Sequence, residues 1–320
     1  MTPTTDFTTG YGHEPVMLRE IVDVFASVPE GCVVDATLGG SGHAVAILRA
    51  HRHLRVLGID QDQRAIDHAN ALRADDADLA ARFSVRKARF DALATEIEHA
   101  GIEEISGALF DLGVSSPQFD LAERGFSYRN DGPLDMRMDA ERALSAHDVV
   151  NGYDVDRLTD VIRTNSDERF AHRIAKAIVA ARPIATTAQL ATVVADAIPA
   201  PARRTGGHPA KRTFQALRIE VNAELEVLPT ALTAALDATA VGGRVAVLSY
   251  HSGEDRIVKH VMRDAQRAEG DVVASPYVHP DSVRSSFRKV RVAERPSREE
   301  MDRNPRASSA RLRVIEKVGC

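Results

Sequence analysis

The chain has 320 residues, of which 44% are apolar and 27% are charged, and its formal net charge is −5. This length exceeds that of most single domains, and no apolar run approaches the roughly 20 residues that a membrane helix needs. The totals favour two domains, or one domain with a large insertion, and exclude a membrane-spanning protein.

The chain ends and the cysteines indicate a cytoplasmic protein. Residues 1–12 lack the basic and apolar segments of a signal peptide, so we expect a frayed polar tail. Cys32 lies in a predicted buried strand and Cys320 ends the chain, so we expect no disulfide. The 12 histidines show no metal-ligand spacing, and we expect no metal site.

Basic and acidic residues are unevenly distributed. Residues 284–320 contain 11 lysines and arginines against 5 acidic residues, whereas the rest of the chain has 30 basic and 41 acidic residues. A second basic cluster, RRTGGHPAKR at 203–212, contains no acidic residue. Such separation suits a partner with a phosphate backbone, although a solvated basic tail has the same composition.

Short apolar runs alternate with helical segments in the first third of the chain. CVVDATL at 32–38 and RVLGIDQD at 55–62 read as strands that end in acids, with a helical segment between them. Two further strands are predicted at 83–90 and 105–114. This alternation predicts a parallel sheet with helices on both faces.

The alternation stops between about residues 120 and 211, where the pattern predicts loops and helices without a convincing strand. One helix is predicted over 166–182, with Ser166 as its capping residue and acids in its first turn. A second is predicted over 187–198 and ends before a proline.

A longer helix is predicted from about Thr213, with Pro229 as the point where it kinks or divides. Gly242 and Gly243 are expected to close it. The sheet pattern then returns at 244–255.

Two late segments, 288–294 and 310–316, are expected to pair as an antiparallel edge. We therefore predict an α/β fold with a doubly wound, Rossmann-like sheet and an inserted helical domain. The expected division is 1–120 for the first part of the sheet domain, 121–211 for the helical insertion and 212–320 for the second part.

A glycine loop, GGSGH at 39–43, follows the first predicted strand at the edge where such folds bind nucleotide cofactors. Asp60 ends the next strand, where a carboxylate can accept hydrogen bonds from both hydroxyls of a ribose. Phe90 ends the third strand, where its ring can contact an adenine or belong to the core.

The charges near this loop distinguish two nucleotide-like cofactors. A dinucleotide fingerprint needs a third glycine after Gly40 and Gly42, but that position is Val45. Asp35 and Asp111, at strand ends, would repel a pyrophosphate and attract the sulfonium and ammonium groups of S-adenosylmethionine. The pattern favours the methyl donor over NAD.

The fourth predicted strand runs into the tetrad Ser116-Pro117-Gln118-Phe119. This tetrad resembles the (Asp/Asn/Ser)-Pro-Pro-aromatic motif of enzymes that methylate exocyclic base amines, with glutamine in place of the second proline. Acceptors on the amine hydrogens would draw the nitrogen toward tetrahedral geometry, and the aromatic ring can stack on a splayed-out base. A Ser-Pro turn that leaves a strand would have the same residues.

Longer blocks make the resemblance specific. GVSSPQFDLAERGFSYRNDGPLDMRMD (113–139), HPAKRTFQALRIEVNAELEVL (208–228) and SYHSGEDRIVK (249–259) closely resemble the bacterial 16S rRNA (cytosine-N4)-methyltransferase family, RsmH, formerly MraW. HEPVMLREIV (13–22) and NPRASSARLRV (305–314) do so too. The similarity extends over nearly the whole chain.

The resemblance implies an S-adenosylmethionine-dependent rRNA methylase that acts on the N4 amine of a decoding-centre cytosine in the small ribosomal subunit. Ser116 and Pro117 are the expected catalytic residues. The implied donor site comprises Ser41, Gly42, His43, Asp60, Phe90, Asp111 and Gln118. The expected RNA contacts are Phe119, Phe126, Tyr128, Arg137, Lys211, Arg212, Arg218 and His251.

Several alternatives stay open. Arg137, which lies between two acids, suits either a structural ion pair or a phosphate contact. Tyr250 and Gly253 occupy positions where the family usually has phenylalanine and leucine, which leaves the role of His251 open. The competing functions are an NAD-dependent oxidoreductase and a non-catalytic RNA-binding or ribosome-assembly factor. Either a monomer or a homodimer is compatible with the sequence.

Overall fold

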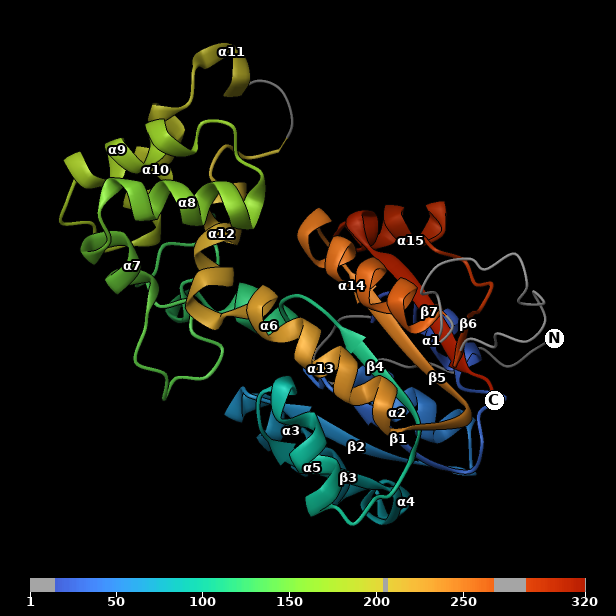
Figure 1. The fold of residues 1–320 in the computed structure, drawn as a ribbon. Helices are drawn as coiled ribbons and strands as arrows, with labels where there is room; N and C mark the ends of the chain where they lie inside the picture. The colour runs from blue at the N-terminus through green and yellow to red at the C-terminus, as the bar shows by residue number, and fades with distance from the viewer. Residues whose placement is uncertain (1–14, 204–206, 268–285, 320) are drawn as a thin grey trace, which may run out of the picture. The chain divides into compact units, whose positions relative to one another are not determined.

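A computed structural model describes residues 15–203, 207–267 and 286–319. The chain forms two compact units, one of residues 1–113 and 227–320 and the other of residues 114–226 (Figure 1). The predicted N-terminal tail, Cys320 and part of the basic cluster at 203–212 lie outside the described residues.

The first unit contains a seven-stranded sheet with the order β3-β2-β1-β4-β5-β7-β6. Strands β1 to β5 pair in parallel, and β7 pairs antiparallel with both β5 and β6. This confirms the predicted doubly wound sheet with an antiparallel edge. The strands are β1 Gly31–Asp35, β2 Leu54–Asp60, β3 Phe83–Lys87, β4 Ile105–Asp111, β5 Thr239–Ser249, β6 Phe287–Lys289 and β7 Arg311–Lys317.

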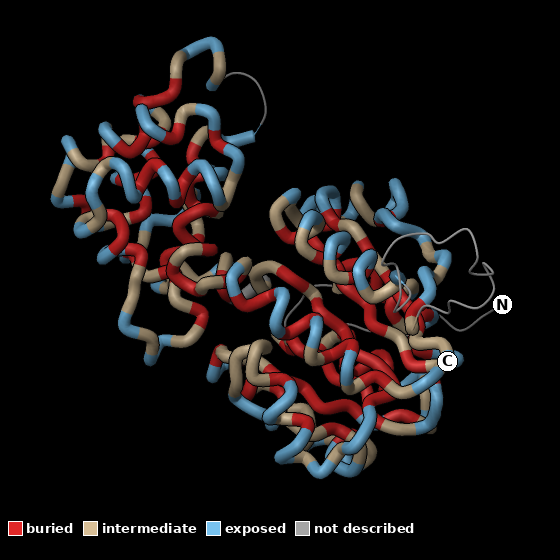
Figure 2. The backbone as a smooth tube through the Cα atoms, viewed as in Figure 1, coloured by how far each residue is buried: buried red, intermediate tan, exposed pale blue. Residues whose placement is uncertain are grey.

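Apolar side chains on both faces of the sheet create two hydrophobic cores. Val33 belongs to one core and its neighbour Val34 to the other, because successive side chains of a strand point to opposite faces. Figure 2 shows the strands as mostly buried. The helices are α1 Leu18–Val24, α2 Gly42–Ala50, α3 Gln63–Asp75, α4 Ala77–Arg82, η1 Phe90–Ala92, α5 Leu93–His99, α13 Glu224–Ala238, α14 Ser252–Ala265, α15 Arg298–Arg303 and η4 Pro305–Ser309.

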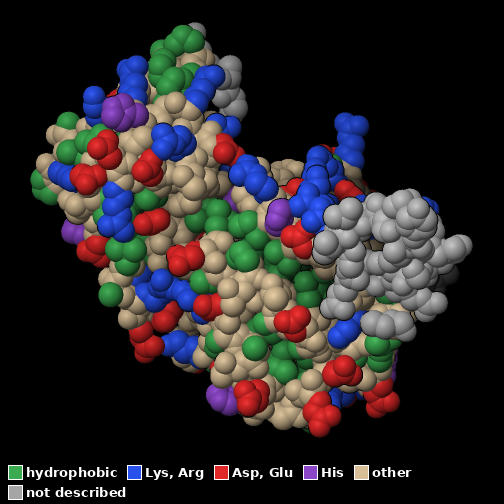
Figure 3. Space-filling view, viewed as in Figure 1, with side chains coloured by type: hydrophobic (Ala, Val, Ile, Leu, Met, Phe, Trp, Pro, Cys, Tyr) green, Lys and Arg blue, Asp and Glu red, His purple; other side chains and the backbone are tan. Residues whose placement is uncertain are grey.

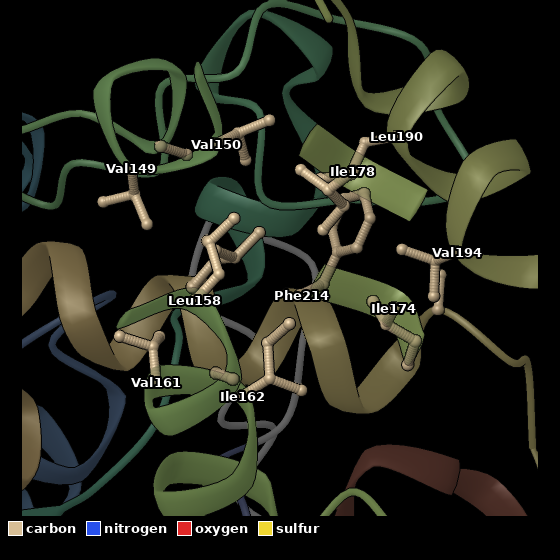
Figure 4. Packing of buried hydrophobic residues seen from close by; sticks show 14 of the residues in the cluster. Val149, Val150, Leu158, Val161, Ile162, Ile174, Ile178, Leu190, Val194 and Phe214 are labelled. Atoms are coloured by element: carbon tan, nitrogen blue, oxygen red, sulfur yellow. The ribbon is translucent and has the colours of Figure 1, made fainter. Parts of the chain in front are cut away.

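The second unit is built from helices around its own core, to which α7, α8, α9, α10 and α12 contribute (Figure 4). Its described residues contain no strand, although Pro133 and Thr186 form an isolated β-bridge. The helices are α6 Ser116–Asp120, η2 Ala122–Arg124, α7 Ala146–Gly152, α8 Val155–Ser166, α9 Ala171–Ala180, α10 Thr187–Ala197, α11 Ala200–Arg203 and α12 Lys211–Asn222. Across the described parts of both units, no helix has the length and apolar character that crossing a membrane requires.

The helix predicted over 166–182 begins later than expected. Ser166 is the last residue of α8, and its hydroxyl donates to the Ile162 carbonyl at 2.6 Å instead of capping a new helix. Asp167 follows in a left-handed conformation, and α9 starts only at Ala171. A serine followed by acids is a cap signal, but here the hydroxyl bonds back to the preceding turn.

The long helix predicted from Thr213 is two helices, and the division does not lie at Pro229. Ala223 separates α12 from α13 with a φ of 55°, whereas Pro229 lies inside α13. Gly242 and Gly243 belong to β5 and do not close a helix.

Helix α12 belongs to the second unit, although the sequence division at 211/212 assigned it to the sheet domain. Phe214, Leu217 and Val221 form one stripe of α12 and lie in the second unit's core. The unit boundaries fall after Gly113 and after Glu226.

Candidate functional site

Three carboxylates lie at the carboxyl ends of adjacent strands. Asp35, Asp60 and Asp111 are the last residues of β1, β2 and β4, and the sheet order places β1 between the other two. The chain order reverses at β1, which has β2 on one side and β4 on the other. Such a switch point opens a crevice at the strand ends, where open α/β sheets bind ligands.

Hydrogen bonds hold the loop after β1 against the neighbouring strand ends. The Gly39 amide donates to Asp60 Oδ2 at 2.8 Å, and the Asp62 amide donates to Asp60 Oδ1 at 2.8 Å. On the other side, the Asp111 amide donates to Thr37 Oγ1 at 2.6 Å. These hydrogen bonds fix the loop to both neighbours of β1.

The first turn of α2 is closely packed against the segment that precedes α1. A Cβ atom at Gly42 would lie 2.3 Å from Cγ of Pro15, so only glycine fits there. His43 is buried, and its Nε2 donates to the Val16 carbonyl at 3.0 Å. Ser41 precedes the helix with a φ of 61°, and its buried hydroxyl has no hydrogen-bond partner among the described residues.

Asp111 has one partner for each of its carboxylate oxygens. The Tyr250 hydroxyl donates to Oδ1 at 2.6 Å, and His43 Nδ1 lies 3.5 Å from Oδ2. Tyr250 was not among the predicted site residues. A tyrosine where the resemblance leads one to expect phenylalanine was a signal in the sequence. The sequence did not show that its hydroxyl reaches Asp111, because the two residues are distant in the chain and only the fold brings them together.

Burial controls the charge of these acids. It raises the pKa of Asp35 to about 7 and that of Asp60 to about 6, and it also raises the pKa of Asp111. Among the described residues, no lysine or arginine forms an ion pair with any of the three. A bound cation would favour their ionised forms, so the cluster suits a positively charged ligand.

S-Adenosylmethionine fits the residues present. Its sulfonium and ammonium groups are positive, as the three carboxylates require, and the unpartnered Ser41 hydroxyl offers a further polar contact. Phe90 begins η1 directly after β3, and its ring meets Phe110 edge-on at 6.3 Å between centroids. Phe90 therefore packs partly on the core, as the sequence allowed, and is half-buried at the same sheet edge.

The predicted tetrad lies at the start of the second unit. Ser116 and Pro117 open α6, but their side chains lie outside the description. Gln118 is buried, and its Oε1 accepts a hydrogen bond from the Ser115 amide at 3.1 Å. Phe119 is half-buried against the second unit's core.

Two predicted RNA-stacking residues have different environments. Phe126 is only 3% exposed in the second unit's core, which argues against the predicted contact with a base. The Tyr128 ring stacks on His208 with centroids 4.5 Å apart, and it meets Phe214 edge-on. His208 is exposed, so this stack reaches the surface.

The basic residues predicted to contact RNA also differ in their environments, because some are engaged in contacts within the protein and others are exposed. Arg137 donates to both carboxylate oxygens of Asp135 and to a backbone carbonyl, which supports the structural alternative for this residue. Arg218 is buried and pairs with Glu224 at 2.8 Å, which argues against a phosphate contact. Lys211 and Arg212 are exposed in the first turn of α12, and Arg212 lies 3.8 Å from a carboxylate oxygen of Glu168.

His251 is the N-cap residue of α14. Its Nδ1 accepts a hydrogen bond from the Glu254 amide at 3.4 Å, and the Glu254 side chain accepts one from the His251 amide in return. This capping box gives His251 a structural role, and its contact with a base stays a prediction.

The basic residues of the C-terminal strands are partly neutralised. Asp255 of α14 pairs with Arg311 and Arg313 of β7, and Glu316 of β7 pairs with Arg288 of β6. Figure 3 shows acidic side chains interspersed with basic ones on the face in view. Asp255 lies outside residues 284–320, so it offsets part of the positive charge counted for that segment.

Comparison with known proteins identifies the family of the chain. Residues 10–318 match the model of the MraW methylase family. The ribosomal RNA small subunit methyltransferases H of Parafrankia sp. and Thermobifida fusca are each 49% identical to this chain over 96% of its length, and the matches cover 94% and 93% of those proteins. The protein of that name from Mycobacterium tuberculosis is 46% identical over 97% of this chain and 81% of its own.

Solved structures align less closely. An rRNA methylase from Streptococcus thermophilus aligns over 94% of both chains at 14% identity with a TM-score of 0.41, too low to support an argument about the site. The match to the family model and the identities of the relatives are sufficient to assign the family without the solved structures. The chain belongs to the MraW methylase family.

Proposed function

We propose that this protein transfers the methyl group of S-adenosylmethionine to the N4 amine of a decoding-centre cytosine in 16S rRNA of the small ribosomal subunit, in the cytoplasm. The observation that carries the proposal is the cluster of Asp35, Asp60 and Asp111 around the glycine loop, in a chain of the methylase family. The relatives are named as small-subunit rRNA methyltransferases, which supports the choice of acceptor.

The donor side of the site follows from charge. Asp111 and Asp35 oppose the positive groups of the donor, and burial strengthens that attraction because little water competes. The Asp60 carboxylate accepts backbone hydrogen bonds from Gly39 and Asp62, and a carboxylate has about four acceptor positions, which leaves capacity for a ribose hydroxyl. When bound, the donor supplies an electrophilic methyl group on a sulfonium.

The acceptor side follows from the tetrad. The lone pair of a cytosine amine is delocalised into the ring, so the nitrogen is a poor nucleophile. Hydrogen-bond acceptors from Ser116 and the backbone beside Pro117 would localise that lone pair, and Phe119 would stack on the base. A donor held at this site would supply the methyl group and depart as S-adenosylhomocysteine as the S–C bond breaks and the N–C bond forms, and the proton lost by the amine would pass to water. Ser116 follows Asp111 by five residues.

The RNA partner must present an unstacked base, because an amine inside a helix cannot reach the donor. Lys211 and Arg212 are exposed basic residues that suit phosphate, and the surface stack of Tyr128 and His208 suits a flanking base. We assign substrate recognition to the helical unit on this basis.

The direct test is methyl transfer from labelled donor to small subunits from cells that lack this activity, followed by nucleoside analysis of the rRNA. We expect label in N4-methylcytidine. Label in a C5-methylated base, or unlabelled RNA from a protein that binds the donor, would contradict the proposal; the second result would favour the assembly-factor alternative.

Substitution of Ser116 by alanine tests the tetrad. We expect the single-turnover rate to fall by about 10²-fold or more, the usual contribution of a group that assists proton transfer, with donor affinity little changed. Rates are measured on the same subunits by rapid quench. A wild-type rate in Ser116→Ala would remove the hydroxyl from the mechanism.

A further inference from the structure

Tyr250 is held in place at three points. Its amide donates to Glu254 Oε2 at 2.7 Å, and its ring packs on Gly113, where a Cβ atom would lie 3.1 Å from Cδ2. Its hydroxyl donates to Asp111 Oδ1 at 2.6 Å. The hydroxyl therefore has little freedom to turn away from the carboxylate.

We propose that Tyr250 is a positioning residue of the donor site, whose hydroxyl orients the Asp111 carboxylate for the positive end of the donor. A phenylalanine at this position would have no group to donate to Asp111, so the contact depends on the hydroxyl of Tyr250. The inference rests on the proposed donor site and adds a residue to it.

The groups that face Asp111 act in opposite directions. Burial and the Glu254 carboxylate of α14 raise the pKa of Asp111, whereas His43 of α2 and the Tyr250 hydroxyl lower it. Asp35, at the end of β1, is a further acid whose own pKa is raised by the charge of Asp111. Burial and the Asp111 charge raise the pKa of Tyr250 well above its usual value, so its hydroxyl remains a donor at ordinary pH.

The sign of the pH effect follows from these contacts. Donor binding needs the Asp111 carboxylate, so protons compete with the donor and affinity falls as pH falls through the pKa of Asp111. Removal of the Tyr250 hydroxyl removes one of the two contacts that lower this pKa. The loss of affinity should then begin at a higher pH than in the wild type.

The test is equilibrium titration of wild type and Tyr250→Phe with S-adenosylmethionine at several pH values. We expect Tyr250→Phe to bind roughly tenfold more weakly than the wild type at the acidic end of the range and within about threefold of it at the alkaline end, as expected for loss of one hydrogen bond to a charged group. The thermal midpoint of each donor-free protein confirms that the variant is folded.

Tyr153→Phe is the matched control, because it also removes a tyrosine–carboxylate hydrogen bond, from the Tyr153 hydroxyl to Glu220 at 3.0 Å, in the second unit. We expect it to follow the wild type at every pH. A Tyr250→Phe curve that matches the wild type, or a loss of equal size at all pH values, would overturn the inference. Absence of donor binding by the wild type itself would instead overturn the proposed donor site.

Discussion

At the scale of single residues, Gly42 of the glycine loop is needed because Pro15 packs too closely for a side chain. Gly42 lies against Pro15, and the next residue, His43, is hydrogen-bonded to the carbonyl of Val16. The segment before α1 thus packs on the first turn of α2. This contact joins residues 15–16 to residues 42–43.

Substitution of Gly42 by alanine should therefore be damaging. The new methyl group would collide with Pro15, so we expect a loss of about 1–3 kcal/mol in unfolding free energy together with weaker donor binding. Urea denaturation measures the first and donor titration the second. Gly152→Ala is the control, since no heavy atom lies within 4 Å of its added Cβ; equal stabilities of the two variants would refute the packing argument.

The sequence predicted the residues at this site whose type is dictated by chemistry. Acids at strand ends and glycines in the loop are visible as letters, and the structure brings Asp35, Asp60 and Asp111 to neighbouring strand ends as expected. Tyr250 and the contact between Pro15 and Gly42 could not be predicted, because each joins segments that are far apart in the chain.

At the scale of elements, the break between α12 and α13 lies where the sequence offers no signal. Pro229 is the sixth residue of α13 and is tolerated inside it, whereas Ala223 adopts a left-handed conformation that normally favours glycine. A proline can be recognised in a sequence as a possible helix break. An alanine that adopts a positive φ, as Ala223 does, cannot be recognised in this way.

Ala223→Gly should consequently stabilise the protein. Glycine adopts a φ of 55° without the Cβ penalty, which we expect to increase the unfolding free energy by about 0.5–1 kcal/mol. The control is Ala71→Gly, an exposed position inside α3, which should cost about 1 kcal/mol. Destabilisation by both substitutions in urea denaturation would show that Ala223 carries no strain.

The strands were predicted better than the helix boundaries, again for a physical reason. The central strands β1 and β4 are buried on both faces and read as nearly continuous apolar runs, so composition is enough to identify them. Ser166 shows the opposite case, because its role as cap or as back-bonded residue depends on where the chain turns.

At the scale of the whole molecule, the sheet is completed by strands from both ends of the chain. The chain leaves the sheet after β4, forms the helical unit, and returns as β5 directly beside β4. The loss of alternating strands and helices predicted this interruption. Its boundaries were not predicted, because α12 has an amphipathic stripe that would suit either unit and only packing assigns it to the second.

The central claim is that the acids at the strand ends bind a positively charged methyl donor, and the most direct measurement is titration of Asp111→Asn with S-adenosylmethionine at about pH 8. The substitution keeps the side-chain size and removes the charge, so we expect affinity to fall at least about tenfold. Asp78→Asn is the control, because Asp78 is an exposed carboxylate of α4, which precedes β3 and so lies at the opposite edge of the sheet. It should bind like the wild type. Wild-type affinity in Asp111→Asn would contradict the account.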